Sequence, residues 1–232
     1  MINIAILGYG VVGGGVAFLC RERAATIKHK RGIEFNIKYI LDTKAFPGDP
    51  LADRILFDVE KIFSDPEVEI IVEAMGGIDE AYAFTKCALQ SGRHVVTSNK
   101  ELVARHGQEL LDLARQAGVF YLFEASVGGG IPLLVTLREA LAANDIIGIS
   151  GILNGTCNYI LTRIEEGISF SDALRDAQAR GYAEREPSDD VSGKDSARKL
   201  AILASMLSGE WINAQDIHTE GIYAINQEDA QL

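Results

Sequence analysis

The sequence has few of the features that mark a disulfide-rich or membrane-spanning chain. It contains only 3 cysteines in 232 residues, and Cys20, Cys87 and Cys157 are odd in number and far apart. This set argues against both a disulfide framework and a thiolate metal site. No run of about 18 apolar residues is present to span a bilayer, and no basic leader precedes the first apolar segment. We therefore expect a cytoplasmic protein from a reducing compartment.

Basic residues are also in the minority. The chain has 22 Lys and Arg against 33 Asp and Glu, so its net charge of −11 would repel a nucleic-acid backbone. The basic segment 21–31 is assigned to an exposed helix face and the loop beyond it. With 47% hydrophobic residues, the composition is that of a globular protein of one large or two small domains. Neither nucleic acid nor membrane is expected as a partner.

Glycines gather near the start of the chain. A short apolar run at residues 3–7 leads into GYGVVG at residues 8–13, and residues 16–20 continue as a helix. The order of strand, glycine turn and helix is the context that the dinucleotide-binding fingerprint requires. The pattern favours binding of NAD or NADP, with a glycine-rich turn in some other α/β protein as the alternative.

Each position of this fingerprint has a physical role. Gly8 would allow the tight turn, Gly10 would let the backbone approach the pyrophosphate, and Gly13 would let the helix pack on the strand. The N–H groups of the first helical turn, including those of Val11 and Val12, would face the phosphates.

An acidic residue follows the second predicted strand. That strand covers residues 35–41 and ends at Asp42, where this fold often places an acid for the ribose hydroxyls. An arginine beside this acid would accommodate a 2′-phosphate, but Leu41 precedes it. The sequence therefore favours NAD, although Lys44 could meet a phosphate. The alternative is that Asp42 is a simple turn residue.

Strands and helices alternate through the first half of the chain. Further strands are predicted at residues 67–73, 94–97 and 119–123, with helices at residues 79–91 and 101–116 between them. This alternation predicts an α/β fold with a parallel, doubly wound sheet of the Rossmann type.

The pattern changes in the second half. An apolar strand is predicted at residues 146–153, between helices at residues 133–141 and 158–166. We therefore place a boundary near residue 130. Residues 1–130 would form the dinucleotide-binding domain, and residues 131–232 an α+β portion for catalysis and dimerisation.

Acidic residues crowd ahead of a lysine in segment 181–199. A proline and a glycine interrupt the helix there, and helical spacing of apolar residues resumes afterwards. Asp195 and Lys199 are four residues apart, so they share a helix face and can present a carboxylate and an ammonium to one small ligand. A lysine so placed can protonate an alkoxide. The alternative is a capping box in which Ser192 caps the helix and Asp195 is its third residue, supplemented by a pairing of Asp195 with Lys199.

Four stretches of the chain resemble homoserine dehydrogenases. They are HVVTSNKELVARHG at residues 94–107, EASVGGGIPLL at 124–134, GILNGTCNYIL at 151–161 and the acidic segment 181–199. Together with the first 15 residues they occur in the family's order and cover much of the chain. The resemblance implies interconversion of L-homoserine and L-aspartate 4-semialdehyde with NAD or NADP, in the pathway to threonine, methionine and isoleucine. It also implies a homo-oligomer, dimer or tetramer.

The resemblance implies roles for single residues. Lys199 would donate a proton to the carbonyl oxygen, Asp195 would hold the resulting hydroxyl, and Lys100 would contact cofactor and substrate. Ser98 and Lys100 also follow the strand at residues 94–97, at the edge where parallel sheets bind ligands. Without the resemblance, Lys100 is interpreted as a solvated lysine. The other implied residues are Glu184, Asp190, Thr156 and Tyr182 for the substrate, Gly76 and Gly181 for the cofactor, and the Glu124 carboxylate with the carbonyls of Val127, Gly129 and Ile131 for a sodium-like ion.

Relatives continue beyond the point where this chain ends at residue 232, with a further strand and a glycine-rich segment that returns to the cofactor. We therefore expect the second portion to be incomplete. Two other functions stay open: an inactive nucleotide-binding fragment or regulatory subunit, and a two-domain dehydrogenase of another amino acid or sugar.

Overall fold

The chain folds into two compact units, Met1–Ile131 and Pro132–Leu232, each with a hydrophobic core of its own. The structure is a computed structural model that describes residues 1–231. Leu232, the last residue of the second domain predicted from the sequence, lies outside the described residues.

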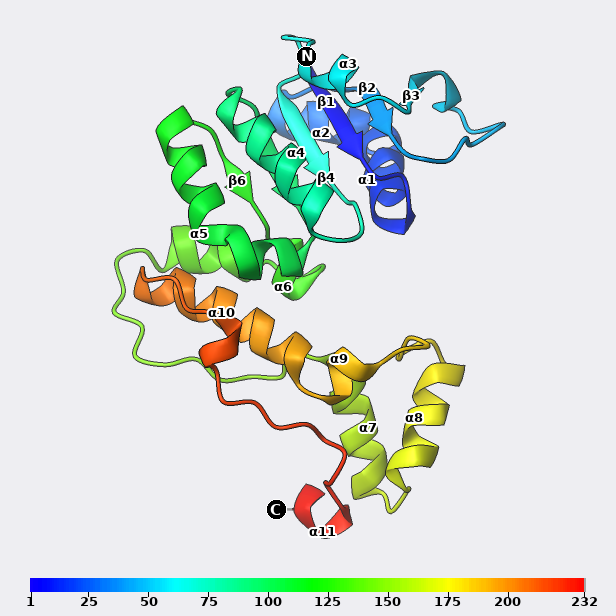
Figure 1. Ribbon diagram of the computed structural model, residues 1–232, viewed down its shortest axis with the longest axis vertical. Helices are drawn as coiled ribbons and strands as arrows, with labels where there is room; N and C mark the ends of the chain where they lie inside the picture. Colours follow the sequence, from blue (N-terminus) through cyan, green and yellow to red (C-terminus); the bar gives the residue numbers. More distant parts are fainter. Residues whose placement is uncertain (232) are drawn as a thin grey trace. The chain divides into compact units, whose positions relative to one another are not determined.

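The first unit is built on one six-stranded sheet in the order β3-β2-β1-β4-β5-β6, and all neighbouring strands are parallel (Figure 1). The predicted doubly wound parallel sheet is confirmed. Its strand order changes direction between β1 and β4, and such a switch point is where open parallel sheets bind ligands. The strands are β1 (Ile2–Leu7), β2 (Phe35–Leu41), β3 (Ile55–Leu56), β4 (Ile70–Glu73), β5 (His94–Thr97) and β6 (Tyr121–Leu122).

Helices connect these strands. The longest, α5, begins after Asn99, whose side chain accepts a hydrogen bond from the N–H of Leu102, and ends at Gly118 with a φ of 68°. Both are favourable helix ends. The Asn99 side chain satisfies a backbone N–H of the first helical turn, and Gly118 adopts the left-handed conformation without strain. None of the helices in residues 1–231 is both long and apolar enough to cross a membrane. The helices of this unit are α1 (Val11–Glu22), α2 (Ala24–Arg31), α3 (Glu60–Phe63), α4 (Asp79–Gln90), α5 (Lys100–Ala117) and α6 (Ala125–Gly128), with a 3-10 turn at Ala52–Arg54.

The central strand β1 shows why the sheet forms. Its last four residues, Ile4, Ala5, Ile6 and Leu7, are all buried. A strand covered on both faces needs such a continuous apolar run rather than an alternating one. The run ends at Gly8, so the chain leaves the core where the glycine turn begins.

In the described residues of the second unit, all regular secondary structure is helical, with irregular segments between the helices. Helices α7 and α8 pack together through Ile160, Ile164, Ala173 and Ala177, and Ile222 joins the same core cluster. The small alanines of α8 let the two helices approach closely. The elements are η2 (Thr136–Ala140, a π-helix), α7 (Gly155–Glu165), α8 (Phe170–Ala179), α9 (Ser188–Val191), α10 (Lys194–Ser208), the 3-10 helix Ala214–Asp216 and α11 (Gln227–Ala230).

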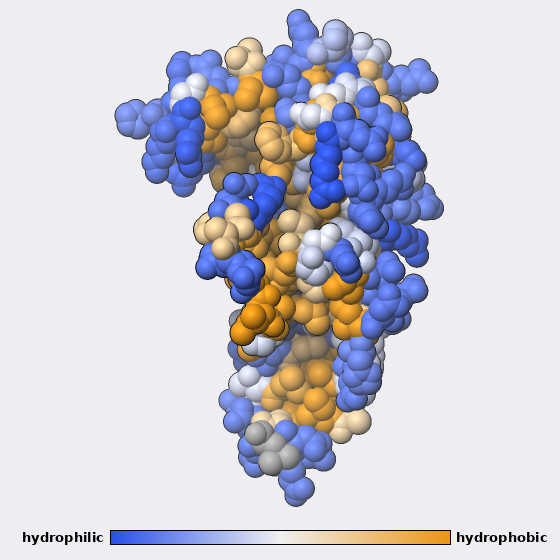
Figure 2. All heavy atoms as spheres, turned by 90° about the vertical axis from the view of Figure 1, so that its left-hand side faces the viewer, coloured by the Kyte–Doolittle hydropathy of each residue, from blue (hydrophilic) through white to orange (hydrophobic). Residues whose placement is uncertain are grey.

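The strand predicted at residues 146–153 is not formed. Residues 145–154 have no regular structure, and residues 132–231 contain no strand with which they could pair. A strand needs a neighbour for its backbone N–H and C=O groups, so the apolar pattern alone does not produce one. Two of its isoleucines stay largely exposed, Ile147 at 102% and Ile152 at 74%. Figure 2 likewise shows hydrophobic side chains reaching the surface.

Candidate active site

The turn after β1 is shaped by two glycines. Gly8 has a φ of 92°, and its N–H donates to the carbonyl of Leu41 over 2.8 Å. A Cβ on Gly8 would lie 2.6 Å from the carbonyl oxygen of Ala74, and one on Gly13 would lie 1.9 Å from the carbonyl oxygen of Gly8. Neither position can hold a side chain without backbone movement. The turn therefore has the geometry predicted for Gly8 and Gly13.

The other side of the turn is open. A Cβ on Gly10 would meet no atom within 4 Å, and the Val11 side chain is 95% exposed. The first intrahelical bond of α1 runs from the N–H of Gly14 to the carbonyl of Gly10, so the N–H groups of Val11, Val12 and Gly13 precede it. An open backbone surface with such N–H groups fits the pyrophosphate of a dinucleotide.

Asp42 lies beside this turn at the end of β2. One oxygen of its carboxylate, Oδ2, accepts from the N–H of Tyr9 over 2.7 Å, and Oδ1 accepts from the N–H of Lys44 over 2.9 Å. The bond from Lys44, two residues further on, is one that turn residues commonly make. The alternative that Asp42 is a turn residue therefore describes part of the role of Asp42. The first bond ties the acid to the glycine turn. Contact with a ribose stays a prediction.

The remaining predicted cofactor residues of this unit follow β4 and β5. These strands pair in parallel register, with Glu73 opposite Thr97, so Gly76 and Ser98 come after strand ends at one edge of the sheet. A Cβ on Gly76 would meet no atom within 4 Å. Lys100 is the first residue of α5.

The predicted ion-binding segment forms a single helical turn, α6, followed by glycines. Gly129 has a φ of 48°, and the carbonyl of Gly128 accepts from the N–H of Ile131 over 2.7 Å. No group of three or more His, Cys, Asp and Glu side chains that could hold a metal is present in residues 1–231. An ion here would therefore depend on backbone carbonyls, such as those of Val127 and Gly129, with Glu124.

In the second unit Asp195 and Lys199 form an ion pair. Lys199 Nζ lies 2.9 Å from Asp195 Oδ2 and also donates to the carbonyl of Leu153 over 2.9 Å. Asp195 is buried, whereas the Lys199 side chain is 18% exposed. The two side chains share a helix face as predicted, and the pairing that formed part of the capping alternative is present. The ammonium is held in place at a partly open position.

The capping box considered as the alternative is wrong. Helix α10 is preceded by Gly193, with a φ of 82° and no side-chain cap, and the Ser192 hydroxyl is buried without a hydrogen-bond partner. Gly193 takes this position because only a glycine adopts a positive φ without strain. A Cβ there would also lie 2.7 Å from the Thr219 side chain. Asp195 therefore has a carboxylate available for long-range contacts.

The sequence interpretation missed Asn154. Its Nδ2 donates to Asp190 Oδ1 over 2.7 Å and to Asp195 Oδ2 over 2.9 Å. Its Oδ1 accepts from the N–H of Cys157 over 2.7 Å and so caps α7. Both amide hydrogens and the oxygen are thus used, and one buried side chain holds two carboxylates. The asparagine before the glycine at the start of α7 was a signal for a helix cap, but not for this bridge.

Cys157 lies next to the same carboxylates. Its thiol donates to the carbonyl of Asp190 over 3.1 Å. Burial, together with the negative charges of Asp190 and Asp195, raises the pKa of the Cys157 thiol to about 11. The side chain is therefore a neutral thiol at physiological pH.

The other predicted substrate residues lie around the start of α7 and the end of α8. The Thr156 hydroxyl is nearly buried and donates to the carbonyl of Tyr182 over 2.6 Å, so it holds the segment that contains Glu184. The Tyr182 ring is 56% exposed and lies 4.9 Å from that of Tyr159. Gly181 has a φ of 76°, and Glu184 is exposed.

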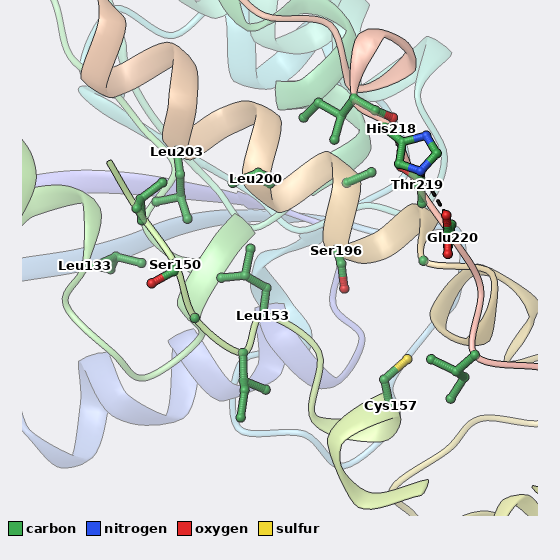
Figure 3. A pocket seen from close by; sticks show the side chains of 17 residues that line it. Leu133, Ser150, Leu153, Cys157, Ser196, Leu200, Leu203, His218, Thr219 and Glu220 are labelled. Carbon is green, nitrogen blue, oxygen red and sulfur yellow. Dashed lines mark hydrogen bonds and ion pairs between the residues drawn. The ribbon is translucent and has the colours of Figure 1, made fainter. Parts of the chain in front are cut away.

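A pocket of about 660 Å³ lies on another face of α10. Figure 3 shows Ser196, Leu200 and Leu203 of α10 opposite Leu153, with His218 paired to Glu220 at one side over 3.0 Å. Among the described residues, those that line it do not include the acids bridged by Asn154 or Lys199. These buried and half-buried charged groups therefore lie in the cluster around Asn154, and this pocket is mainly apolar.

The fold and the glycine turn define a dinucleotide-binding protein of the Rossmann type. A family model described as "Homoserine dehydrogenase, NAD binding domain" matches residues 8–124, and a model described as "Homoserine dehydrogenase" matches residues 132–232. The chain belongs to the homoserine dehydrogenase family, and it carries that family's NAD(P)-binding domain. The predicted resemblance is confirmed.

Individual proteins and solved structures similar to this chain are also homoserine dehydrogenases. Homoserine dehydrogenase of Helicobacter pylori is 41% identical over 234 residues, which cover 100% of this chain and 55% of the relative. A crystal structure of a homoserine dehydrogenase from Thiobacillus denitrificans matches with a TM-score of 0.91 at 38% identity, covering 98% of this chain and 54% of that one. A hyperthermophilic archaeal homoserine dehydrogenase in complex with NADPH matches with a TM-score of 0.85 at 29% identity, covering 99% and 75%. The chain spans about half the length of the curated relatives it matches.

Proposed function

We propose that this chain catalyses reversible hydride transfer between a nicotinamide cofactor and a four-carbon amino acid, interconverting L-homoserine and L-aspartate 4-semialdehyde. The reaction would belong to the synthesis of threonine, methionine and isoleucine from aspartate. The observation that carries the proposal is the Lys199 ammonium, held 2.9 Å from buried Asp195 in a chain with a dinucleotide-binding turn.

Lys199 is proposed as the proton donor. Its bonds to Asp195 and to the carbonyl of Leu153 use two of its three N–H donors, and the third would protonate the carbonyl oxygen as the aldehyde is reduced. The bound cofactor supplies the hydride. In the reverse direction a neutral lysine amine would accept the hydroxyl proton.

The acidic residues would select an amino acid over an uncharged aldehyde. Asp195 would hold the reacting hydroxyl, and Glu184, assisted by Asp190, would bind the substrate ammonium. Thr156 and Tyr182 would line the substrate site. A charged ammonium requires carboxylate partners when it leaves water, which supports this assignment.

In the first unit, the glycine turn and the residues that follow β2, β4 and β5 are proposed to contact the cofactor. Asp42 supports NAD over NADP, because its carboxylate would repel a 2′-phosphate. The NADPH complex of the archaeal relative makes NADPH the form to compare. The full set is Gly8, Gly10, Val11, Val12, Gly13, Asp42, Gly76, Ser98 and Lys100, with Gly181 from the second unit.

Two further features are proposed from the family resemblance. A sodium-like ion would bind the Glu124 carboxylate and the carbonyls of Val127, Gly129 and Ile131, because hard cations prefer oxygen ligands. The working protein would be a homo-oligomer, a dimer or a tetramer.

The experiment is a spectrophotometric assay of NADH and NADPH oxidation with L-aspartate 4-semialdehyde. We expect Lys199→Ala to lower kcat by about 10²–10⁴-fold, the contribution typical of a positioned acid. Lys194→Ala is the matched control, since Lys194 is an exposed lysine on the same helix. Cofactor binding without turnover in the wild type would support a nucleotide-binding fragment, and turnover only with other carbonyl compounds would support a different dehydrogenase.

A further inference from the structure

Glu73 is a buried carboxylate that the proposed reaction does not use. It is the last residue of β4 and is 1% exposed, in a sheet whose other strand residues are mostly apolar. Burial raises the pKa of its carboxyl, although hydrogen bonds from Thr97, Met75 and Asn99 oppose this shift. Burying such a group is costly unless it is hydrogen-bonded, so its partners indicate its purpose.

The first partner lies in the turn after β4. Glu73 Oε1 accepts from the N–H of Met75 over 2.8 Å and so holds the start of residues 74–77. The same turn contains Ala74, whose carbonyl oxygen would lie 2.6 Å from a Cβ on Gly8. The carboxylate therefore fixes a segment that packs directly against the glycine turn.

The second partner leads to the turn after β5. Glu73 Oε2 accepts from the Thr97 hydroxyl, which in turn accepts from the N–H of Asn99 over 2.9 Å. Asn99 then donates through Nδ2 to the carbonyl of Gly77 over 2.8 Å. The chain of bonds thus returns to the turn where it began, so one carboxylate connects the segments that follow two adjacent strands.

We propose that Glu73 is a positioning residue of the dinucleotide site, which fixes the backbone turns after β4 and β5 in the arrangement that the cofactor requires. The proposal rests on the proposed cofactor role of Gly8, Gly76 and Ser98. Glu73 itself acts through Met75 and Thr97.

A purely structural role predicts something different. If Glu73 served only to stabilise the sheet, its substitution would lower the free energy of unfolding and leave cofactor affinity unchanged while the protein is folded. A positioning role predicts weaker binding in a folded protein, because a displacement of a few tenths of an ångström at the site is enough to lose affinity.

Two near-isosteric variants test this. Glu73→Gln keeps an oxygen for the N–H of Met75 but places an NH₂ group against the Thr97 hydroxyl. Thr97→Val removes that hydroxyl and leaves Glu73 in place. Thr85→Val is the matched control, because Thr85 is a buried threonine of α4 whose hydroxyl has no hydrogen-bond partner.

The measurement is the dissociation constant for NADH and for NADPH, by fluorescence titration at a temperature where circular dichroism shows every variant folded. We expect Glu73→Gln and Thr97→Val each to weaken binding by about tenfold, and the double variant to weaken it little further, since both break one hydrogen-bond path. Thr85→Val should bind as the wild type does. Amide hydrogen exchange should accelerate at Asn99 more than at Met75 in Glu73→Gln.

The outcomes separate the two proposals. If the wild type binds cofactor and both variants bind it equally tightly, the role of Glu73 is refuted and the proposed function stands. If the wild type binds neither dinucleotide, the proposed cofactor role fails and the Glu73 proposal fails with it. If Glu73→Gln does not fold, Thr97→Val alone decides between weakened and unchanged binding.

Discussion

The two units of this chain build their candidate sites by different physical means. In the first, the site is backbone: glycines at residues 8 and 13 leave no room for a Cβ, and open N–H groups begin α1. In the second, it is a set of side chains that Asn154 brings together from segments 36 and 41 residues away. A backbone site depends on a few adjacent residues with one conformation, whereas a side-chain site depends on the packing of several helices.

The largest effect should come from adding one methyl group to the backbone site. In Gly13→Ala the new Cβ would lie 1.9 Å from the Gly8 carbonyl oxygen, so α1 must move away from β1. We expect NAD(H) binding to weaken by at least about 100-fold and the unfolding free energy to fall by about 1–3 kcal/mol. Calorimetric titration and urea denaturation measure the two effects.

The control for that variant is Gly15→Ala in the same helix, where a Cβ would meet no atom within 4 Å. It should bind cofactor normally and gain up to about 1 kcal/mol of stability from better helix propensity. Equal behaviour of the two variants would contradict the close packing at Gly13.

A smaller effect is expected in the second unit from Asn154→Ser. Serine retains a good helix cap for α7 but cannot donate to both Asp190 and Asp195. We expect the unfolding free energy to fall by about 1–3 kcal/mol and kcat to fall more than KM rises, because the carboxylates lose their fixed position. Asn226→Ser, which replaces the cap of α11, should change neither kcat nor KM.

The smallest predicted difference concerns two cysteines, one from each unit. The pKa of the Cys157 thiol is raised to about 11, so its thiolate is scarce at pH 8, whereas Cys87 is exposed. Iodoacetamide should alkylate Cys87 first. The rate at Cys157 should rise about tenfold per unit between pH 8 and 10, because the thiolate fraction grows by that factor below the pKa. Mass spectrometry of timed digests gives both rates, and faster labelling of Cys157 at pH 8 would contradict its burial beside two acids.

The difference between a site built from adjacent residues and one built from distant side chains also explains what the sequence could predict. The strands at residues 35–41 and 94–97 were located correctly, and so was the glycine turn, because each depends on neighbouring residues. The Asp195–Lys199 pair was also predictable, since four residues make one helical turn.

Features that depend on distant residues were missed. The bridge made by Asn154 required knowledge that α7 and α10 meet, which no local pattern encodes. The strand predicted at residues 146–153 had the right apolar content but lacked a partner. The capping alternative placed the N-cap at Ser192 because of its residue type, whereas Gly193, with its positive φ, takes that position one residue later.

The proposed function requires that the glycine turn and the Asp195–Lys199 pair serve one reaction. The most direct measurement uses NADH or NADPH deuterated at the transferable position of the nicotinamide, with L-aspartate 4-semialdehyde as substrate, and analyses the product by mass spectrometry. We predict L-homoserine carrying one deuterium from the wild type, and the same labelled product formed about 10²–10⁴-fold more slowly by Lys199→Ala. Failure of the wild type to produce labelled homoserine, or an equal rate of labelling by the Lys199 variant, would contradict the proposal.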